Sequence, residues 1–230
     1  MPIYRLTEEL IFPPVHLAED GLLAVGGNLS RKRLLLAYRS GIFPWYSDGE
    51  PLLWWSPDPR MVLIPEEFHC SRSLLRVVKK GTFRVTLNQA FAQVIHACGE
   101  TPRPGQDGTW ITSEMEAAYI DLHEAGYAMS IECWSGETLV GGLYGIALGG
   151  CFFGESMFSH QPNASKVAAY TLVRAASAWG IPLIDCQVAN PHLQSLGARE
   201  IRREAFLARL TVGLRAPLSE HAWLTLPTEI

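Results

Sequence analysis

The chain has 230 residues, of which 48% are hydrophobic and 18% charged, and its formal net charge is −4. A chain this rich in apolar side chains can bury a sizeable core, which excludes intrinsic disorder. The mildly acidic balance also excludes a generally basic nucleic-acid-binding protein, so any contact with RNA must come from a local patch.

The first 60 residues are rich in Pro, Gly and Trp and predict one helix, which begins after Ser30 and ends at Gly41. From residue 61 onward helices and strands follow each other more regularly. Helices are predicted at 71–80, after Asn88 as N-cap, from a Ser113/Glu116 capping box to about 125, from Asn163 to 179, after Pro191 and at 203–214. Strands are predicted at 83–87, 127–134, 137–147, 151–155 and 182–186, with a hairpin turn at Ser135-Gly136 and a loop at 102–108.

This order predicts an α+β fold in which helices cover a mixed sheet. The change in composition near residue 60 predicts two domains, a small one at 1–60 and a larger one at 61–230. No apolar run approaches the ~20 residues that span a bilayer, and the first residues do not resemble a signal peptide. The five cysteines form no CxxC pair and the seven histidines no HxH or HExxH motif, so we expect a reduced, cytoplasmic protein without a metal site.

The predicted strand at 182–186 leads into a group of polar residues. If the strand alternates regularly, Asp185 and Gln187 share one face and Cys186 points into the core. The carboxylate and the amide can together hold an amine, with Asn190 at the following turn. The alternative is that Asp185 caps a turn or pairs with an arginine. Cys186 is interpreted as structural rather than nucleophilic.

Glu155 interrupts an apolar strand, where a carboxylate is costly unless it is paired. Such carboxylates concentrate at functional sites, although a strand-end glutamate that faces water is equally consistent with the pattern. The surrounding segment, Gly154 to Phe158, lacks the second glycine of a G-x-S-x-G nucleophile elbow, so we reject a serine hydrolase.

Charges are unevenly distributed along the chain. No acidic residue occurs from 68 to 99, where Arg72, Arg76, Lys79 and Lys80 share one helical face and Arg84 follows. This stripe is either a solvated face or a contact for a polyanion. No Lys or Arg occurs from 104 to 165, so this acidic stretch is a candidate contact for a cation.

Four tryptophans lie on turn-rich segments rather than on helical faces. These are Trp45, Trp54, Trp55 and Trp110. Indoles stack well on nucleic-acid bases, at ~1–3 kcal/mol per base, but loop tryptophans also fill the seam between two domains.

Together these segments closely resemble the bacterial leucyl/phenylalanyl-tRNA–protein transferases over roughly residues 10–210. Each motif is weak alone, but their order is highly specific. The motifs are GLLA (21–24), GGNLS (26–30), AYRSGIFPW (37–45), WWSPDPR (54–60), GTWIT (108–112), GESMFS (154–159), NASK (163–166) and DCQ (185–187).

The resemblance implies an enzyme that moves Leu or Phe, and to a lesser degree Met, from aminoacyl-tRNA to proteins that begin with Arg or Lys, marking them for N-degron degradation. It implies a C-terminal domain with an acetyltransferase-like (GNAT) fold, a monomer, and no cofactor. The segment Ser159 to Pro162 also lacks the Gly-rich pyrophosphate loop of acetyl-CoA enzymes.

Carried onto this chain, the resemblance assigns four groups of residues. The terminal adenosine of the tRNA falls on Trp45 and Trp110, and the donor side chain falls on Leu143, Phe152, Met157 and Ile184. The catalytic polar positions are Asp185, Gln187, Glu155 and Asn190, and the contacts with the tRNA body are Arg76, Lys80 and Arg84.

Two other classes of function remain open at the level of sequence. A noncatalytic RNA- or peptide-binding module would need the basic stripe and the tryptophans but not Asp185 and Gln187. A conventional acetyltransferase is disfavoured because the pyrophosphate loop is missing.

Overall fold

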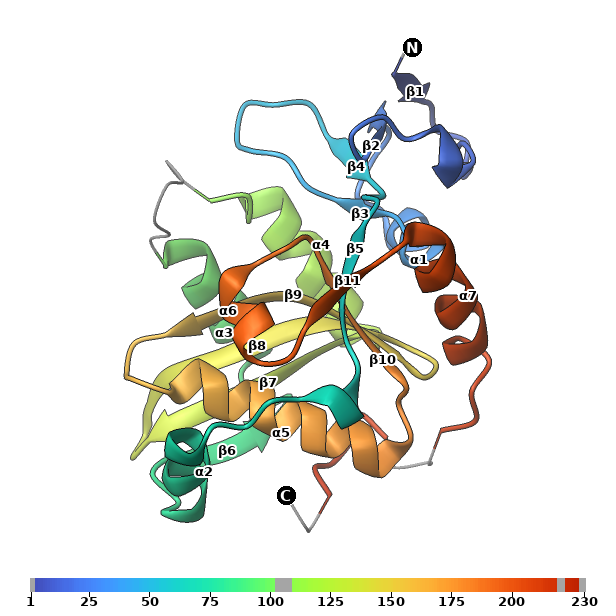
Figure 1. Cartoon of the computed structure of the whole chain (residues 1–230). Helices are drawn as coiled ribbons and strands as arrows, with labels where there is room; N and C mark the ends of the chain where they lie inside the picture. The colour runs from blue at the N-terminus through green and yellow to red at the C-terminus, as the bar shows by residue number, and fades with distance from the viewer. Residues whose placement is uncertain (1–2, 102–108, 219–221, 228–230) are drawn as a thin grey trace.

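The computed structural model describes residues 3–101, 109–218 and 222–227 (Figure 1). The N-terminal part forms a small four-stranded sheet in the order β1-β2-β4-β3, beside helix α1 (Arg31–Arg39). Its strands are β1 (Tyr4–Leu6), β2 (Leu22–Gly26), β3 (Phe43–Pro44) and β4 (Leu53–Trp55), and a 3-10 turn, η1, spans Val15–Leu17.

The larger sheet has seven strands in the order β11-β5-β10-β9-β8-β7-β6. Its strands are β5 (Arg60–Leu63), β6 (Arg84–Leu87), β7 (Ala128–Ser135), β8 (Thr138–Leu148), β9 (Cys151–Ser159), β10 (Leu183–Gln187) and β11 (Arg199–Ile201). Strands β9 and β10 run parallel and all other neighbours in this sheet run antiparallel, so the sheet is mixed.

Helices cover both faces of the larger sheet (Figure 1). They are α2 (Arg72–Lys79), α3 (Phe91–Glu100), α4 (Ser113–Glu124), α5 (Ala164–Trp179), α6 (Pro191–Ser195) and α7 (Arg203–Gly213), with a 3-10 turn, η2, at Pro65–Glu67. Successive residues of β9 enter opposite cores: Phe152 joins the cluster with α5, whereas Phe153 joins the cluster with α3, α4 and α1.

The prediction of a mixed sheet flanked by helices is confirmed, and each predicted helix and strand is present within a few residues. The Ser135-Gly136 hairpin is also confirmed. The assignment to an acetyltransferase-like class and the division at residue 60 stay predictions. The predicted loop at 102–108 lies outside the described residues.

Three local predictions are wrong. Helix α3 begins at Phe91 without a cap from Asn88, whose side chain instead binds the backbone of Ser130. Helix α4 is capped by Thr112, which accepts the amide of Met115, so the predicted capping box is displaced by one residue. Strand β9 continues to Ser159 because its pairing with β8 persists beyond the apolar run.

Strands β9 and β10 separate halfway along their length, and this separation positions the site. Their parallel pairing covers only residues 183–185 against 151–153. Beyond that point β9 stays with β8 up to Ser159, whereas β10 stays with β5 up to Gln187. The register shifts at Glu155 in β9 and at Cys186 in β10, so each strand bulges where the two strands part.

Candidate functional site

A pocket of about 340 Å³ opens where β9 and β10 separate. All four predicted donor-pocket residues line it: Leu143, Phe152, Met157 and Ile184. Helix α5 forms the opposite wall with Ala169, Leu172 and Val173. This part of the pocket is therefore apolar, and it lies between the sheet and α5.

Two predicted aromatic residues line the same pocket. Trp45 follows β3 and Trp110 precedes α4, and both indoles are partly exposed. Trp55 stabilises the first of them, because its Nε1 donates to the Trp45 carbonyl at 2.7 Å and the two rings lie 5.7 Å apart. The structure thus brings together two tryptophans that are 65 positions apart in the chain.

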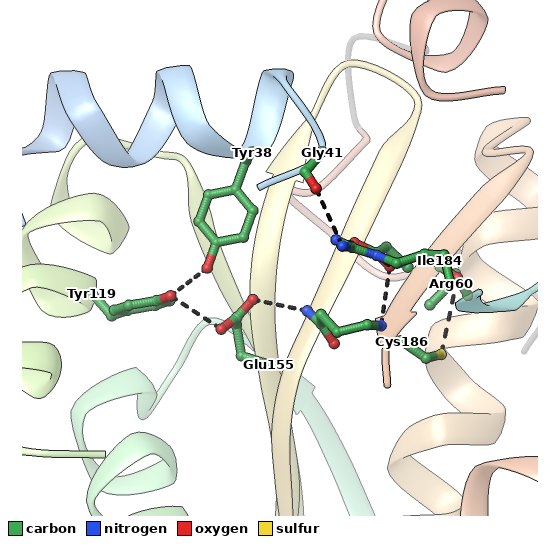
Figure 2. A network of polar contacts seen from close by, with 9 residues as sticks. Tyr38, Gly41, Arg60, Tyr119, Glu155, Ile184 and Cys186 are labelled. Carbon is green, nitrogen blue, oxygen red and sulfur yellow. Dashed lines mark hydrogen bonds and ion pairs between the residues drawn. The ribbon is translucent and has the colours of Figure 1, made fainter. Parts of the chain in front are cut away.

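Glu155 lies in the pocket wall at the end of a chain of buried hydroxyls (Figure 2). Tyr119 of α4 donates to its Oε2 at 3.0 Å, and Tyr119 in turn shares a hydrogen bond with Tyr38 of α1. Burial raises the pKa of Glu155 to about 8 and outweighs the opposing effect of the tyrosine hydroxyls. The nearby Asp185 carboxylate raises the pKa further, although Arg60 counteracts it.

Gln187 connects the two strands across the gap. Its Nε2 donates to Glu155 Oε1 at 3.1 Å, and its backbone has a φ of 57°. This left-handed conformation is costly for a residue other than glycine, and such strain concentrates at functional sites. Because the bulge at Cys186 adds one residue, Gln187 turns into the pocket instead of following the regular alternation of the strand.

Asp185 does not face the pocket, which corrects the expectation that it shares a face with Gln187. Its carboxylate is fully buried and forms a two-pronged ion pair with Arg60, at 2.8 Å from Nε and 2.6 Å from Nη2. The same carboxylate accepts the backbone N–H of Gln187 at 3.0 Å. The alternative interpretation, a pair with an arginine, is therefore the one observed, and Asp185 acts on the pocket through Gln187.

Arg60 is held from every side. Its guanidinium stacks between the rings of Phe43 and Phe206, 4.8 and 4.6 Å from their centroids, and its Nη1 donates to the Gly41 carbonyl at 3.2 Å. Gly41 has a φ of 74°, and a Cβ there would lie 2.7 Å from Leu207, so this position requires glycine. Arg60 thereby ties the turn after α1, helix α7 and strand β10 into one frame (Figure 2).

Asn190 lines the pocket at the start of α6. Its Oδ1 accepts the backbone N–H groups of His192 and Leu193 at 2.8 and 3.4 Å. Since the cap uses the side-chain oxygen, the amide NH₂ group is the part of Asn190 that can donate to a ligand.

Cys186 lines the pocket but is a poor nucleophile. Burial and the Asp185 carboxylate raise the pKa of its thiol, so the thiolate is disfavoured. All five cysteines are free, and no cluster of three metal-ligating side chains occurs within residues 3–101, 109–218 and 222–227. In the same part of the chain, no helix is long and apolar enough to cross a bilayer.

The basic residues Arg76, Lys80 and Arg84 lie apart from the pocket. All three are exposed, and Arg84 lies over the ring of Trp134 at 5.1 Å. Strand β6 is three positions from β9 in the sheet order, which at ~4.8 Å per strand corresponds to roughly 14 Å. The basic stripe is therefore a separate surface of the same domain.

Sequence reasoning missed Arg60, Tyr38 and Tyr119 as parts of the site. Arg60 and Tyr38 lie inside the quoted motifs WWSPDPR and AYRSGIFPW, so their position in those motifs was the available signal. Tyr119 has the spacing of an ordinary core residue on α4, and only its contact with Glu155 identifies it.

The chain is similar to known proteins over nearly its whole length. Residues 62–211 match the family model described as leucyl/phenylalanyl-tRNA protein transferase, and residues 27–58 match the model of its N-terminal domain. The relatives carry the name leucyl/phenylalanyl-tRNA–protein transferase. They include proteins from Anaeromyxobacter sp. (56% identity; 97% of this chain, 95% of the relative), Syntrophus aciditrophicus (57%; 99% and 95%) and Syntrophobacter fumaroxidans (57%; 97% and 96%).

The fold and the site define a protein with a deep apolar pocket, two indoles in its wall and a hydrogen-bonded carboxylate–amide pair. The chain belongs to the leucyl/phenylalanyl-tRNA–protein transferase family. This confirms the resemblance and the prediction of an aminoacyltransferase. Among solved structures, FemX superposes with a TM-score of 0.47 at 13% identity, covering 75% of this chain and 66% of that chain, and we base no conclusion on it.

Proposed function

We propose that this protein transfers Leu or Phe, and less efficiently Met, from aminoacyl-tRNA to the α-amine of proteins that begin with Arg or Lys. The product carries a new N-terminal residue that marks it for N-degron degradation. The observation that carries the proposal is one pocket that joins indoles, apolar walls and the Glu155–Gln187 pair. A noncatalytic binding module would not need this pair.

The donor binds with its three parts in three regions of the pocket. The terminal adenosine stacks on Trp45 and Trp110, and the amino-acid side chain enters the apolar region. Glu155 holds the α-ammonium of the donor, because a carboxylate whose ionised form is disfavoured by burial gains most from a cation. Apolar walls reject a similar side chain weakly, which fits a preference that extends from Leu and Phe to Met.

The reaction needs no covalent enzyme intermediate because the donor is already an activated ester. The acceptor amine, with a pKa of ~8, loses a proton and attacks the ester carbonyl carbon. A C–N bond forms, the bond from carbon to the ribose oxygen breaks, and the ribose oxygen takes up a proton. Alignment of the two substrates is a major contribution, since it can supply several kcal/mol.

Gln187 and Asn190 orient this step. Because Nε2 of Gln187 donates to Glu155, its carbonyl oxygen is free to accept a hydrogen bond from the attacking amine. Asp185 and Arg60 are positioning residues that hold the strained Gln187 backbone in place. Asn190 donates through its amide NH₂ to the oxyanion that develops on the carbonyl.

The acidic stretch provides a partner for the acceptor's basic side chain. Within it, Glu114 is exposed in the first turn of α4 and acts electrostatically on Tyr46, which directly follows Trp45. We assign Glu114 to the recognition of the acceptor's Arg or Lys. On the separate basic surface, Arg76, Lys80 and Arg84 contact the phosphates of the tRNA body.

A transfer assay tests the proposal. The purified protein is incubated with radiolabelled Leu-tRNA and peptides that differ only in their first residue, Arg, Lys or Ala, without acetyl-CoA. Label should enter the Arg and Lys peptides and not the Ala peptide. Absence of label in all three peptides contradicts the proposed activity, and label that requires acetyl-CoA supports the acetyltransferase alternative.

A further inference from the structure

We infer that Trp223, in the C-terminal segment 222–227, is a positioning residue that sets the depth of the donor side-chain pocket through Phe152. This inference rests on the proposed function, because it concerns which amino acid the pocket prefers. Trp223 lies beyond residue 211, where the match to the family model ends. The segment lies on the side of the sheet that α5 covers (Figure 1).

Phe152 is the wall residue through which Trp223 acts. Its side chain lines the pocket from β9, and its ring stacks on the indole of Trp223 with centroids 5.3 Å apart and planes inclined by 24°. On another side the ring meets the backbone of Gly145, where a Cβ would lie 2.6 Å from it. The backbone at Gly145 cannot yield, so the indole determines whether the Phe152 ring can move away from the pocket.

The indole is itself fixed in place. Trp223 is only 7% exposed and packs against Trp179 at the end of α5, with ring centroids 4.8 Å apart. Its carbonyl accepts Nδ2 of Asn88 at 2.9 Å, and Asn88 accepts the backbone N–H of Ser130 at 3.0 Å. Asn88 thus anchors the C-terminal segment to the sheet, which is the role its side chain has in place of a helix cap.

Trp223 contributes shape rather than a hydrogen bond. Its Nε1 is buried and finds no acceptor among the residues that the structure describes. A buried indole N–H without a partner is unfavourable, so packing against Phe152 and Trp179 must outweigh that cost. A phenylalanine at this position keeps the aromatic stack but fills less space, whereas an alanine removes the support of Phe152 entirely.

The loss of this support should change donor selectivity in a definite direction. In Trp223→Ala the Phe152 ring can move toward the vacated space, and the closed end of the pocket becomes deeper. Leu then fills the pocket less well, whereas the larger Phe side chain recovers contacts. The ratio of kcat/KM for Leu-tRNA to that for Phe-tRNA should fall about fivefold or more, within the range that small changes in an apolar pocket produce.

The experiment compares wild-type protein, Trp223→Ala, Trp223→Phe and the control Leu224→Ala, each as the full chain. Leu224 is 68% exposed in the same segment, so its truncation leaves the pocket unchanged. Leu-tRNA and Phe-tRNA are assayed separately with one Arg-starting peptide. We expect the Leu-to-Phe ratio to fall most in Trp223→Ala, less in Trp223→Phe and not in Leu224→Ala.

Equal losses with both donors, or an unchanged ratio, overturn the inference, because a merely structural role lowers both rates alike. If Trp223→Ala does not fold, as judged by circular dichroism, the ratio in Trp223→Phe decides. A wild-type protein that transfers neither amino acid contradicts the proposed function instead, so the two failures are distinguishable.

Discussion

The buried ion pair between Arg60 and Asp185 makes a strong prediction about stability. Asp185 accepts two hydrogen bonds from Arg60, at 2.8 and 2.6 Å, and one from the Gln187 backbone at 3.0 Å, and both charged side chains are almost fully buried. Removing one partner of such a pair costs about 3–5 kcal/mol, because the other charge stays buried. Asp185→Asn retains an acceptor oxygen, so we expect a loss of about 3 kcal/mol in the free energy of unfolding.

Urea denaturation measures this loss, and Asp121→Asn is the matched control. Asp121 pairs with Arg31 at 2.5 Å, but both side chains are nearly half exposed, so its loss should cost under ~1 kcal/mol. Asp185→Asn should also lower kcat by about tenfold or more and change the KM for Leu-tRNA little, because Asp185 does not line the pocket. A stability loss as small as that of the control, or a change in KM alone, refutes the reasoning.

Further predictions concern proton binding, pocket size and tRNA contact. Because the pKa of Glu155 is raised from 4.5 to about 8, the native state binds this proton more tightly, and the free energy of unfolding should fall as the pH rises from about 5 to 8. Glu155→Gln should flatten this fall in denaturation curves; an unchanged slope contradicts the assignment. Leu143→Phe narrows the pocket, so kcat/KM for Phe-tRNA should fall about tenfold more than for Leu-tRNA, and equal losses would show that Leu143 does not contact the donor. Replacing Arg76, Lys80 and Arg84 by alanine should weaken tRNA binding and reduce its salt dependence, by up to about 0.9 per phosphate contact on a log–log plot, whereas the exposed Lys32→Ala should not.

Helices and long strands were predictable because their signals are local. The apolar residues of α3, for example, recur with helical spacing, and all four predicted inward residues, Phe91, Val94, Ile95 and Cys98, are buried. The short strands β3, β5 and β11 have no such signal, because their pairing partners lie far away in the sequence. The N-terminal sheet was therefore missed from composition and periodicity.

The site was predictable to the extent that single residues announced themselves. Glu155 interrupts an apolar strand, and the predicted donor-pocket side chains all line one pocket. The role of Asp185 was not predictable, because its partner Arg60 lies 125 positions away. The bulge at Cys186 also breaks the alternation on which the shared face of Asp185 and Gln187 depended.

The most direct test of the account is the single-turnover rate of Leu transfer in Gln187→Ala. Enzyme preloaded with Leu-tRNA is mixed with an Arg-starting peptide, and peptide-bond formation is followed by mass spectrometry of the product. We predict normal binding of Leu-tRNA and a transfer rate about 100-fold lower than wild type, since the amine loses the group that orients it. A transfer rate equal to that of the wild-type protein would contradict the claim that the Glu155–Gln187 pair aligns the reaction.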